Sequence, residues 1–390
     1  MYRKFKADKI FTGEKFLEGE NVLLTDNEGR IIDIVLEEDA GNDIESIDGI
    51  LSPGFINCHC HLELSHLKEF IPKYSGLTDF VYKVVTERNF DEALILRSIA
   101  GAEDSMLKEG IVAVGDICNN THTIPQKKNH RLYYHNFIEV AGFTESVSES
   151  RFKNAGEISE AFSKSLLVNS IVPHAPYSVS PTLLRKINSL PKNSILSIHN
   201  QEADDENIFF LKGDGDLVRM YEKMNIDISF FKPTGKTSLQ SWLPQFTNGQ
   251  SILLVHNVAT QEQDLQFVKA STKHSSNNLS IYFCLCPNAN LYISNKLPDV
   301  PLFVGNDCNI VLGTDSLASN SQLSIIEEIN TLQQHFPELE MEMMLQWATM
   351  NGARALRIEK DFGSFEIGKK PGIIGIKKNE NNKFRSERVL

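Results

Sequence analysis

Eight short apolar segments, each followed by enough chain for a helix, constrain the possible fold more than any other feature of this sequence. They are residues 54–61, 111–116, 132–140, 170–174, 195–199, 252–256, 280–286 and 310–315. Helical signals lie between them: apolar residues recur at helical spacing over 91–108, and Ser180-Pro181 is typical of a helix start. Eight such units over about 300 residues predict an α/β protein, a (β/α)8 TIM barrel. A doubly wound parallel sheet is the alternative, but no Gly-x-Gly-x-x-Gly motif follows any segment.

Both ends of the chain have a different character. Residues 22–24 and 31–35 flank Asp26-Asn-Glu-Gly29, a hairpin turn signal, and short strand-like runs return over 363–376. We therefore predict two domains. One is a β-sandwich built from residues 1–52 plus 359–390, and the other is a barrel over 53–358. The polar last dozen residues are expected to be frayed.

Charge and cysteine content exclude several classes of protein. Lys and Arg number 39 against 51 Asp and Glu, so the net charge is 39 − 51 = −12. Such a chain lacks the basic face that binds nucleic acid, and it gains nothing from anionic lipid. Its apolar runs, such as 251–255, are far shorter than the roughly 20 residues that cross a bilayer. Six cysteines, four of them in Cys-x-Cys pairs, indicate a reducing cytoplasm rather than a disulfide framework. A homodimer is the common default for such a protein.

The chemistry begins at Asn57-Cys-His-Cys-His61. Successive strand residues face opposite ways, so His59 and His61 point to one side, whereas Cys58 and Cys60 point toward the helices. Two imidazoles on one strand form half of a site for a divalent metal. Taken alone, a His-x-His pair is explained better by chance or packing than by a metal site.

Other predicted strands also end in residues that bind metals: His199, His256 and Asp315. Because barrel active sites assemble at the carboxyl ends of strands, these side chains should converge. Three imidazoles and a carboxylate suit Zn²⁺, with Fe²⁺ possible, and leave a position for a water that the ion converts to hydroxide at neutral pH. His256 is either a ligand or a group that orients that hydroxide. Glu202, three residues after His199, is placed to move a proton; the competing interpretation is a surface acid in an acidic loop.

With these residues assembled, the chain resembles the amidohydrolase superfamily, in its chlorohydrolase-like and nucleoside- or base-deaminase branch. The motifs are Ser52-Pro-Gly-Phe-Ile-Asn-Cys-His-Cys-His61, Pro173-His-Ala-Pro-Tyr-Ser178, His199-Asn-Gln-Glu202, His256, Cys286-Pro-Asn288, Gly313-Thr-Asp-Ser316 and Thr349-Met-Asn-Gly-Ala-Arg354.

The resemblance implies a set of roles for these residues. It implies metal ligation by His59, His61, His199 and Asp315, proton transfer by Glu202, and a place for His256 beside the metal-bound hydroxide. It also implies a substrate contact by His174. The third and fourth strands offer no lysine, which favours one metal ion over a binuclear, carbamylated-lysine site. One departure is Pro371-Gly-Ile-Ile374, where relatives usually carry Ala-Asp-Leu.

For the substrate, His61-Leu-Glu-Leu-Ser65 is similar to the same stretch in aminodeoxyfutalosine deaminases. We expect a metal-dependent aminohydrolase, a cyclic amidine deaminase, acting on an aminated purine nucleoside or related heterocycle. Glu63, His174 and Ser316 are candidate substrate contacts, and Glu63 is equally a residue that orients a metal ligand. Removal of chloride or another amine from a heterocycle, a non-catalytic barrel scaffold and a purely structural metal site are the alternatives.

Overall fold

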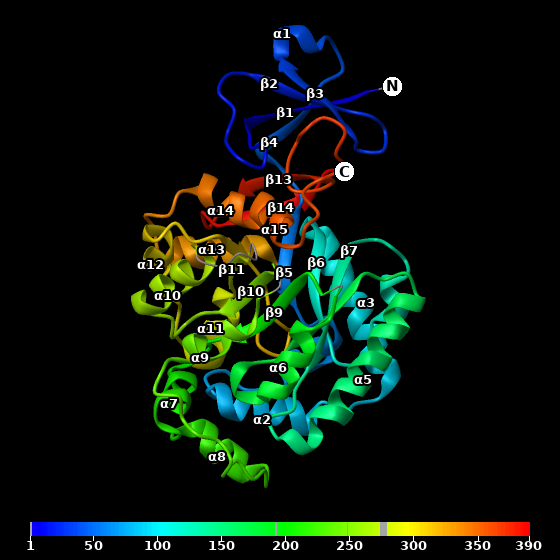
Figure 1. Cartoon of the computed structure of the whole chain (residues 1–390). Helices are drawn as coiled ribbons and strands as arrows, with labels where there is room; N and C mark the ends of the chain where they lie inside the picture. The colour runs from blue at the N-terminus through cyan, green and yellow to red at the C-terminus, as the bar shows by residue number, and fades with distance from the viewer. Residues whose placement is uncertain (1, 192, 248, 274–278) are drawn as a thin grey trace.

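A computed structural model describes residues 2–191, 193–247, 249–273 and 279–390 of the chain. Most of the strands form two four-stranded parallel sheets, flanked by helices (Figure 1). The first sheet has the order β5 (Phe55–Cys60), β6 (Ile111–Cys118), β7 (Tyr133–Val140) and β8 (Asn169–Pro173). The second has the order β12 (Ile310–Leu312), β11 (Ser280–Leu285), β10 (Ser251–His256) and β9 (Ile195–Asn200). All eight predicted strands are confirmed, with ends shifted by up to three residues.

The two sheets meet at the carboxyl ends of their edge strands. The backbone N–H of His199 donates to the carbonyl oxygen of His174 at 2.9 Å, which links β9 to the end of β8. On the other side, the N–H of Thr314 donates to the carbonyl oxygen of His59 at 3.0 Å, and Cys60 forms a parallel bridge with Asp315. The strand ends of both sheets are thereby brought into one neighbourhood.

The helices alternate with these strands and cover them on the outside (Figure 1). Those described are α1 (Glu37–Ala40), η1 (Leu62–Leu67), α2 (Leu77–Glu87), α3 (Glu92–Lys108), α4 (Ile124–Lys127), α5 (Glu145–Lys164), η2 (Pro176–Ser178), α6 (Pro181–Asn188), α7 (Asp204–Lys212), α8 (Asp216–Lys223), α9 (Ser238–Trp242), η3 (Leu243–Gln245), α10 (Glu262–Lys273), α11 (Pro287–Ser294), α12 (Val300–Gly305), α13 (Ile325–His335), α14 (Met341–Ala348) and α15 (Met350–Ala355). None of the described helices combines the length and the apolar character that a membrane crossing requires.

Helix α3 shows why these segments are helical. The carboxylate of Asp91 accepts from the N–H of Leu94, which satisfies one of the free donors at the helix start. The predicted apolar stripe is buried against the sheet, with Ile99 and Met106 both fully covered. In α6, Ser180 caps the N–H of Leu183 in the same way, as predicted.

Strands from both ends of the chain form one six-stranded sheet. Its order is β14 (Phe384–Arg388), β13 (Ile373–Lys378), β4 (Glu45–Pro53), β1 (Arg3–Ile10), β2 (Asn21–Thr25) and β3 (Ile31–Leu36). The predicted hairpin is confirmed: Gly29 has φ +81° and its N–H donates to the carbonyl oxygen of Asp26. The expectation of a frayed carboxyl end is wrong, because β14 pairs antiparallel with β13 from Lys378 and Phe384 to Ile374 and Arg388.

Candidate active site at the carboxyl ends of the strands

Strand β5 presents its two histidines to one side, as the alternation predicts. His59 is fully buried and His61 is 7% exposed. The neighbouring cysteine faces away: a Cβ added to Gly352 of α15 would lie 3.1 Å from the Cys58 sulfur. Cys58 therefore packs toward the helix layer and leaves the histidine side free for chemistry.

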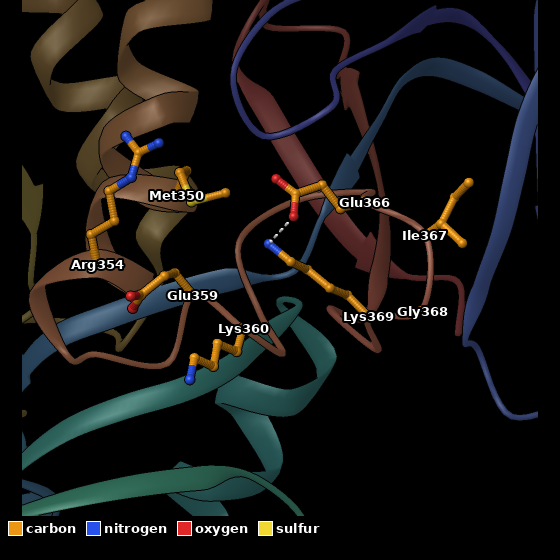
Figure 2. Close-up of a pocket in the computed structure, with 8 residues that line it drawn as sticks. All are labelled: Met350, Arg354, Glu359, Lys360, Glu366, Ile367, Gly368 and Lys369. Carbon is orange, nitrogen blue, oxygen red and sulfur yellow. Dashed lines mark ion pairs between the residues drawn. The ribbon is translucent and has the colours of Figure 1, made fainter.

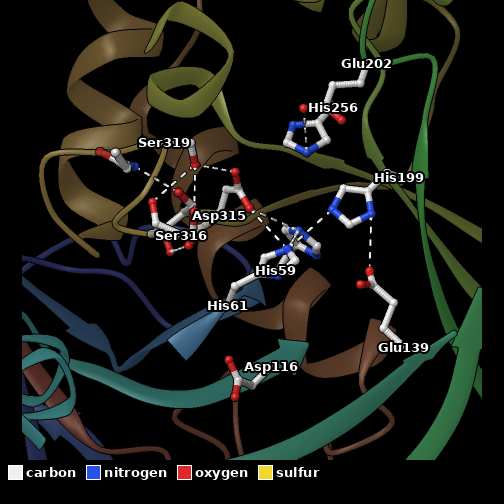
Figure 3. A network of polar contacts seen from close by, with 12 residues as sticks. His59, His61, Asp116, Glu139, His199, Glu202, His256, Asp315, Ser316 and Ser319 are labelled. Carbon is white, nitrogen blue, oxygen red and sulfur yellow. Dashed lines mark hydrogen bonds and ion pairs between the residues drawn. The ribbon is translucent and has the colours of Figure 1, made fainter. Parts of the chain in front are cut away.

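The four predicted metal ligands converge on one point (Figure 3). The Nε2 atom of His61 lies 3.2 Å from Nε2 of His59 and 3.3 Å from Nε2 of His199. The Asp315 Oδ1 atom lies 3.5 Å from His59 Nε2 and 3.3 Å from His61 Nε2. Four side chains from three regions of the sequence thus aim ligand atoms at a single small volume.

This spacing fits one zinc ion. Ligand atoms bound to the same zinc at about 2.0–2.1 Å lie roughly 2.9–3.6 Å apart for bond angles of about 90–120°, which are angles that a five-coordinate ion with a bound water also has. The second ring nitrogen of His199, Nδ1, donates to the carbonyl oxygen of His174 at 2.8 Å. That hydrogen bond leaves the lone pair of His199 Nε2 directed into the cluster, the tautomer that a metal needs.

The charge states also suit a metal. Burial lowers the pKa of His199 to about 4, so its ring is neutral at pH 7. Burial alone would raise the pKa of Asp315, but its hydrogen bond with His59 and the nearby His61 and His256 rings hold that pKa well below the usual range. The Ser319 hydroxyl donates to the other carboxylate oxygen of Asp315 and fixes its orientation. The cluster therefore offers three neutral imidazoles and one carboxylate.

Three residues of the site have a left-handed backbone conformation. The φ values are +46° for Gln201, +77° for His256 and +56° for Asp315, and residues other than glycine adopt this conformation at an energetic cost. Strand β12 was predicted to reach Asp315 but ends at Leu312. The strand ends early because the N–H groups of Thr314 and Asp315 both turn to the carbonyl oxygen of His59.

Glu202 and His256 lie beside the cluster. Glu202 is 6% exposed, so the alternative of a surface acid is wrong. Its Oε1 atom is 3.6 Å from Nε2 of His256, which is fully buried. Burial and the negative charges of Asp315 and Glu206 raise the pKa of Glu202 well above its ordinary value. A carboxyl group with a raised pKa can accept and return a proton near neutral pH.

The three predicted substrate contacts occupy different positions. The ring of His174 lies 4.9 Å from that of His199, and its Nδ1 atom contacts the Ser178 hydroxyl at 2.7 Å. Ser316 is buried next to Asp315, with its hydroxyl 3.1 Å from that of Ser319.

Glu63, the third predicted contact, is also covered. It is 2% exposed, and burial raises its pKa to about 7. One of its oxygens accepts from the N–H of Asn119 at 3.0 Å. The other has no hydrogen-bond partner within the described part of the chain.

Sequence reasoning gave no role to two side chains of this region. Glu139, near the end of β7, lies 3.6 Å from His199 Nδ1. Although burial opposes its ionisation, His174, His199 and His61 lower the pKa of Glu139 to about 2. Glu139, His174 and His199 form a second group of side chains that could hold a metal ion. However, Nδ1 of His199 already donates a hydrogen bond to a carbonyl oxygen, so it cannot bind a second ion there. The other residue is Asn290, which contacts His256. Its only sequence signal is its place just after Cys286-Pro-Asn288.

A surface cavity of about 610 Å³ shares no residue with this cluster (Figure 2). It is lined by Met350, Arg354, Glu359, Lys360, Glu366, Ile367, Gly368 and Lys369. The cavity mixes acidic and basic side chains, and Lys369 is already paired with Glu366 at 2.9 Å. The cavity is large, but its charged side chains do not form a group with an evident chemical role, so the buried cluster remains the candidate active site.

The chain is similar to known proteins over most of its length. A family profile described as "Amidohydrolase family" matches residues 50–387. An adenosine deaminase of Helicobacter pylori is 26% identical over 353 residues, which cover 88% of this chain and 82% of that protein.

Two solved structures share the fold. A crystal structure of H. pylori aminofutalosine deaminase with methylthio-coformycin has a TM-score of 0.81 at 22% identity, covering 97% of this chain and 93% of the other. A Xanthomonas campestris adenosine deaminase with bound zinc has a TM-score of 0.70 at 18% identity, covering 96% and 84%.

Proposed function

Because the chain belongs to the amidohydrolase family, we propose that it is a metal-dependent aminohydrolase that removes ammonia from an aminated purine nucleoside or a related heterocycle. The observation that carries this proposal is the set of His59, His61, His199 and Asp315 around one point, with Glu202 and His256 beside it. Relatives named adenosine deaminase and aminofutalosine deaminase support the type of reaction.

The metal that we propose is one Zn²⁺ ion, held by these four side chains. The imidazole-rich donor set and its spacing support zinc, as does the zinc bound to the X. campestris relative. A zinc ion bound there would lower the pKa of a water molecule to about 7 and so would supply the nucleophile. The chain itself supplies orientation, proton transfer and exclusion of bulk water.

Each nearby side chain has one task in this proposal. Glu202 takes a proton from the attacking water and delivers it to the amino group of the substrate, which leaves as ammonia while the ring carbon gains oxygen. His256 donates a hydrogen bond toward the space where that carbon reacts. Asp315, held by Ser319, completes the ligand set and balances the charge of the ion. Because these groups are at most 7% exposed, their electrostatic effects are little screened by water.

For the substrate we propose aminofutalosine-like nucleosides first. His174, Glu63 and Ser316 are the proposed contacts, and the unpartnered oxygen of Glu63 supports a role as acceptor for a substrate hydroxyl or ring N–H. All three are at the carboxyl ends of strands, on the side of the metal cluster.

We also propose that the two four-stranded sheets form one (β/α)8 barrel over 53–358. The contacts between β8 and β9, and between β5 and the chain after β12, support closure. Residues 1–52 and 359–390 would form the second domain, for which we keep the proposal of a β-sandwich. The pairing of β4 with β13 in one sheet supports a domain shared by both ends of the chain. Six free cysteines support a reducing, cytoplasmic setting, and the proposed homodimer is tested by light scattering on the purified chain.

An ammonia-release assay on protein of known metal content tests the proposed function. The substrate panel contains adenosine, aminofutalosine, other aminated purines and a chlorinated triazine. Ammonia from a nucleoside, with about one metal per chain, is the expected result. Chloride release from the triazine alone would replace this function with the removal of another leaving group, and a metal-loaded protein inert on the whole panel would contradict the proposal.

A further inference from the structure

The side chain of Asn290 makes one contact that the proposed mechanism does not use. Asn290 lies in α11 and is 1% exposed. Its amide nitrogen is 3.0 Å from Nδ1 of His256. Within the described residues, neither the amide oxygen of Asn290 nor Nε2 of His256 has another hydrogen-bond partner. Among the described residues, the amide and the imidazole therefore pair with each other, and the orientation of the amide determines which ring nitrogen carries the proton.

Two arrangements of this pair are chemically consistent. Either the amide N–H₂ donates to a bare Nδ1, and the ring carries its proton on Nε2, or the amide is turned and Nδ1–H donates to its oxygen. The surroundings of Nε2 distinguish them. Nε2 faces the carboxyl group of Glu202, whose Oε1 atom is 3.6 Å away. When Glu202 is ionised, as it must be to take a proton from water, a proton on Nε2 meets an acceptor there, whereas a lone pair on Nε2 would be repelled.

Contacts around Asn290 and His256 keep the two side chains adjacent. The N–H of Asn288, at the start of α11, donates to Oε2 of Glu328 at 2.9 Å, and the Asn290 carbonyl accepts from the hydroxyl of Ser294 at 3.1 Å. The ring of His256 stacks on that of His199 at 5.4 Å with an interplanar angle of 20°. These contacts hold the backbone around Asn290 and the ring of His256, so the amide and the ring stay next to each other.

We propose that Asn290 is a positioning residue that holds His256 as the neutral Nε2–H tautomer, so that His256 enters the reaction as a hydrogen-bond donor. This inference rests on the proposed function only for its effect on the rate. The tautomer itself is a property of the resting protein.

Nitrogen-15 NMR of histidine-labelled, zinc-loaded protein measures the tautomer directly, because protonated and bare ring nitrogens have separate chemical shifts. A His256→Gln variant identifies the signals of this ring. The expected result is a proton on Nε2 and a bare Nδ1 in the unaltered chain. A proton on Nδ1 would overturn the proposal, whatever the enzyme does with any substrate.

Two substitutions test the consequence. Asn290→Asp keeps the size but replaces a donor with an acceptor, which should move the proton to Nδ1. Asn290→Leu removes the donor and should leave a mixture of tautomers. In the serine protease triad the wrong histidine tautomer costs about 10⁴ in kcat, so we expect losses of about 10²- to 10⁴-fold in kcat with KM changed less than about threefold. The matched control is Asn295→Asp, the same change at an exposed residue just after α11.

The combined outcomes are decisive. A shifted tautomer in Asn290→Asp with lost kcat and retained zinc supports the inference. Unchanged kcat in a zinc-loaded Asn290→Asp protein overturns it. If neither variant folds, the spectrum of the unaltered chain still gives a positive or negative answer. If no substrate is turned over, the proposed function fails, but the NMR result separately decides the role of Asn290.

Discussion

Replacing Glu202 with glutamine tests the proton-transfer step of the proposed mechanism. The change keeps the shape of the side chain and its 6% exposure but removes the group that takes and returns a proton. We expect the zinc content to stay at about one per chain, since Glu202 is not among the four clustered ligands. The loss should fall on kcat.

The size of the loss follows from which other groups could move the proton. His256 Nε2 is 3.6 Å from Glu202 Oε1, but in the proposed tautomer this nitrogen already carries a proton and cannot accept another. Glu206 already accepts from Ser238 Oγ at 2.5 Å and from the N–H of Glu202 at 3.4 Å. Asp315 is engaged by His59 and by Ser319. Because none of these three groups is available to replace Glu202, we expect a fall near the upper end of general acid–base effects, about 10³- to 10⁴-fold.

That fall corresponds to about 4–5.5 kcal/mol of transition-state stabilisation. The assay is steady-state ammonia release with metal analysis of the same samples, and Glu222→Gln, on the exposed face of α8, is the matched control. A metal-loaded Glu202→Gln protein with kcat within tenfold of the unaltered chain would refute the reasoning. So would loss of metal, because it would make Glu202 part of the metal site.

Three further perturbations have clear expected outcomes. Asp315→Asn removes the one carboxylate of the cluster and should lower zinc affinity by at least tenfold, measured by competition with a chromogenic chelator; unchanged affinity would remove Asp315 from the ligand set. Burial raises the pKa of Glu328 to about 8, above its unfolded value, so its stabilising contribution is complete below about pH 4.3 and is lost as the pH rises toward 8. The melting temperature of the unaltered chain should therefore fall relative to that of Glu328→Gln between pH 5 and about pH 8, and parallel curves would contradict this. Ile99→Ala removes a fully buried side chain of α3 and should cost about 2–5 kcal/mol in denaturant unfolding, whereas Leu94→Ala, at a 37% exposed residue of the same helix, should cost less than about 1 kcal/mol.

Local pattern was sufficient for much of this protein. A strand alternates its side chains and a helix repeats every 3.6 residues, so each apolar segment could be assigned from its own sequence. All eight strands were located in this way, and the placing of His59 and His61 on one side needed only the alternation along β5. The rule that parallel strands present their carboxyl ends together then brought His199 and Asp315 to the same site.

The tertiary structure decided what local pattern could not. The contact between His256 and Asn290 joins residues 34 positions apart, and nothing in the local sequence around either residue predicts the other as its partner. The strand at 384–388 forms only because β13 lies beside it, so a polar sequence that resembles a frayed end becomes ordered. Glu202 occupies an acidic loop that looks exposed in sequence, yet it is buried because the chain turns inward at Gln201. In each case the deciding energy comes from contacts between distant segments, and those contacts exist only once the whole chain has packed.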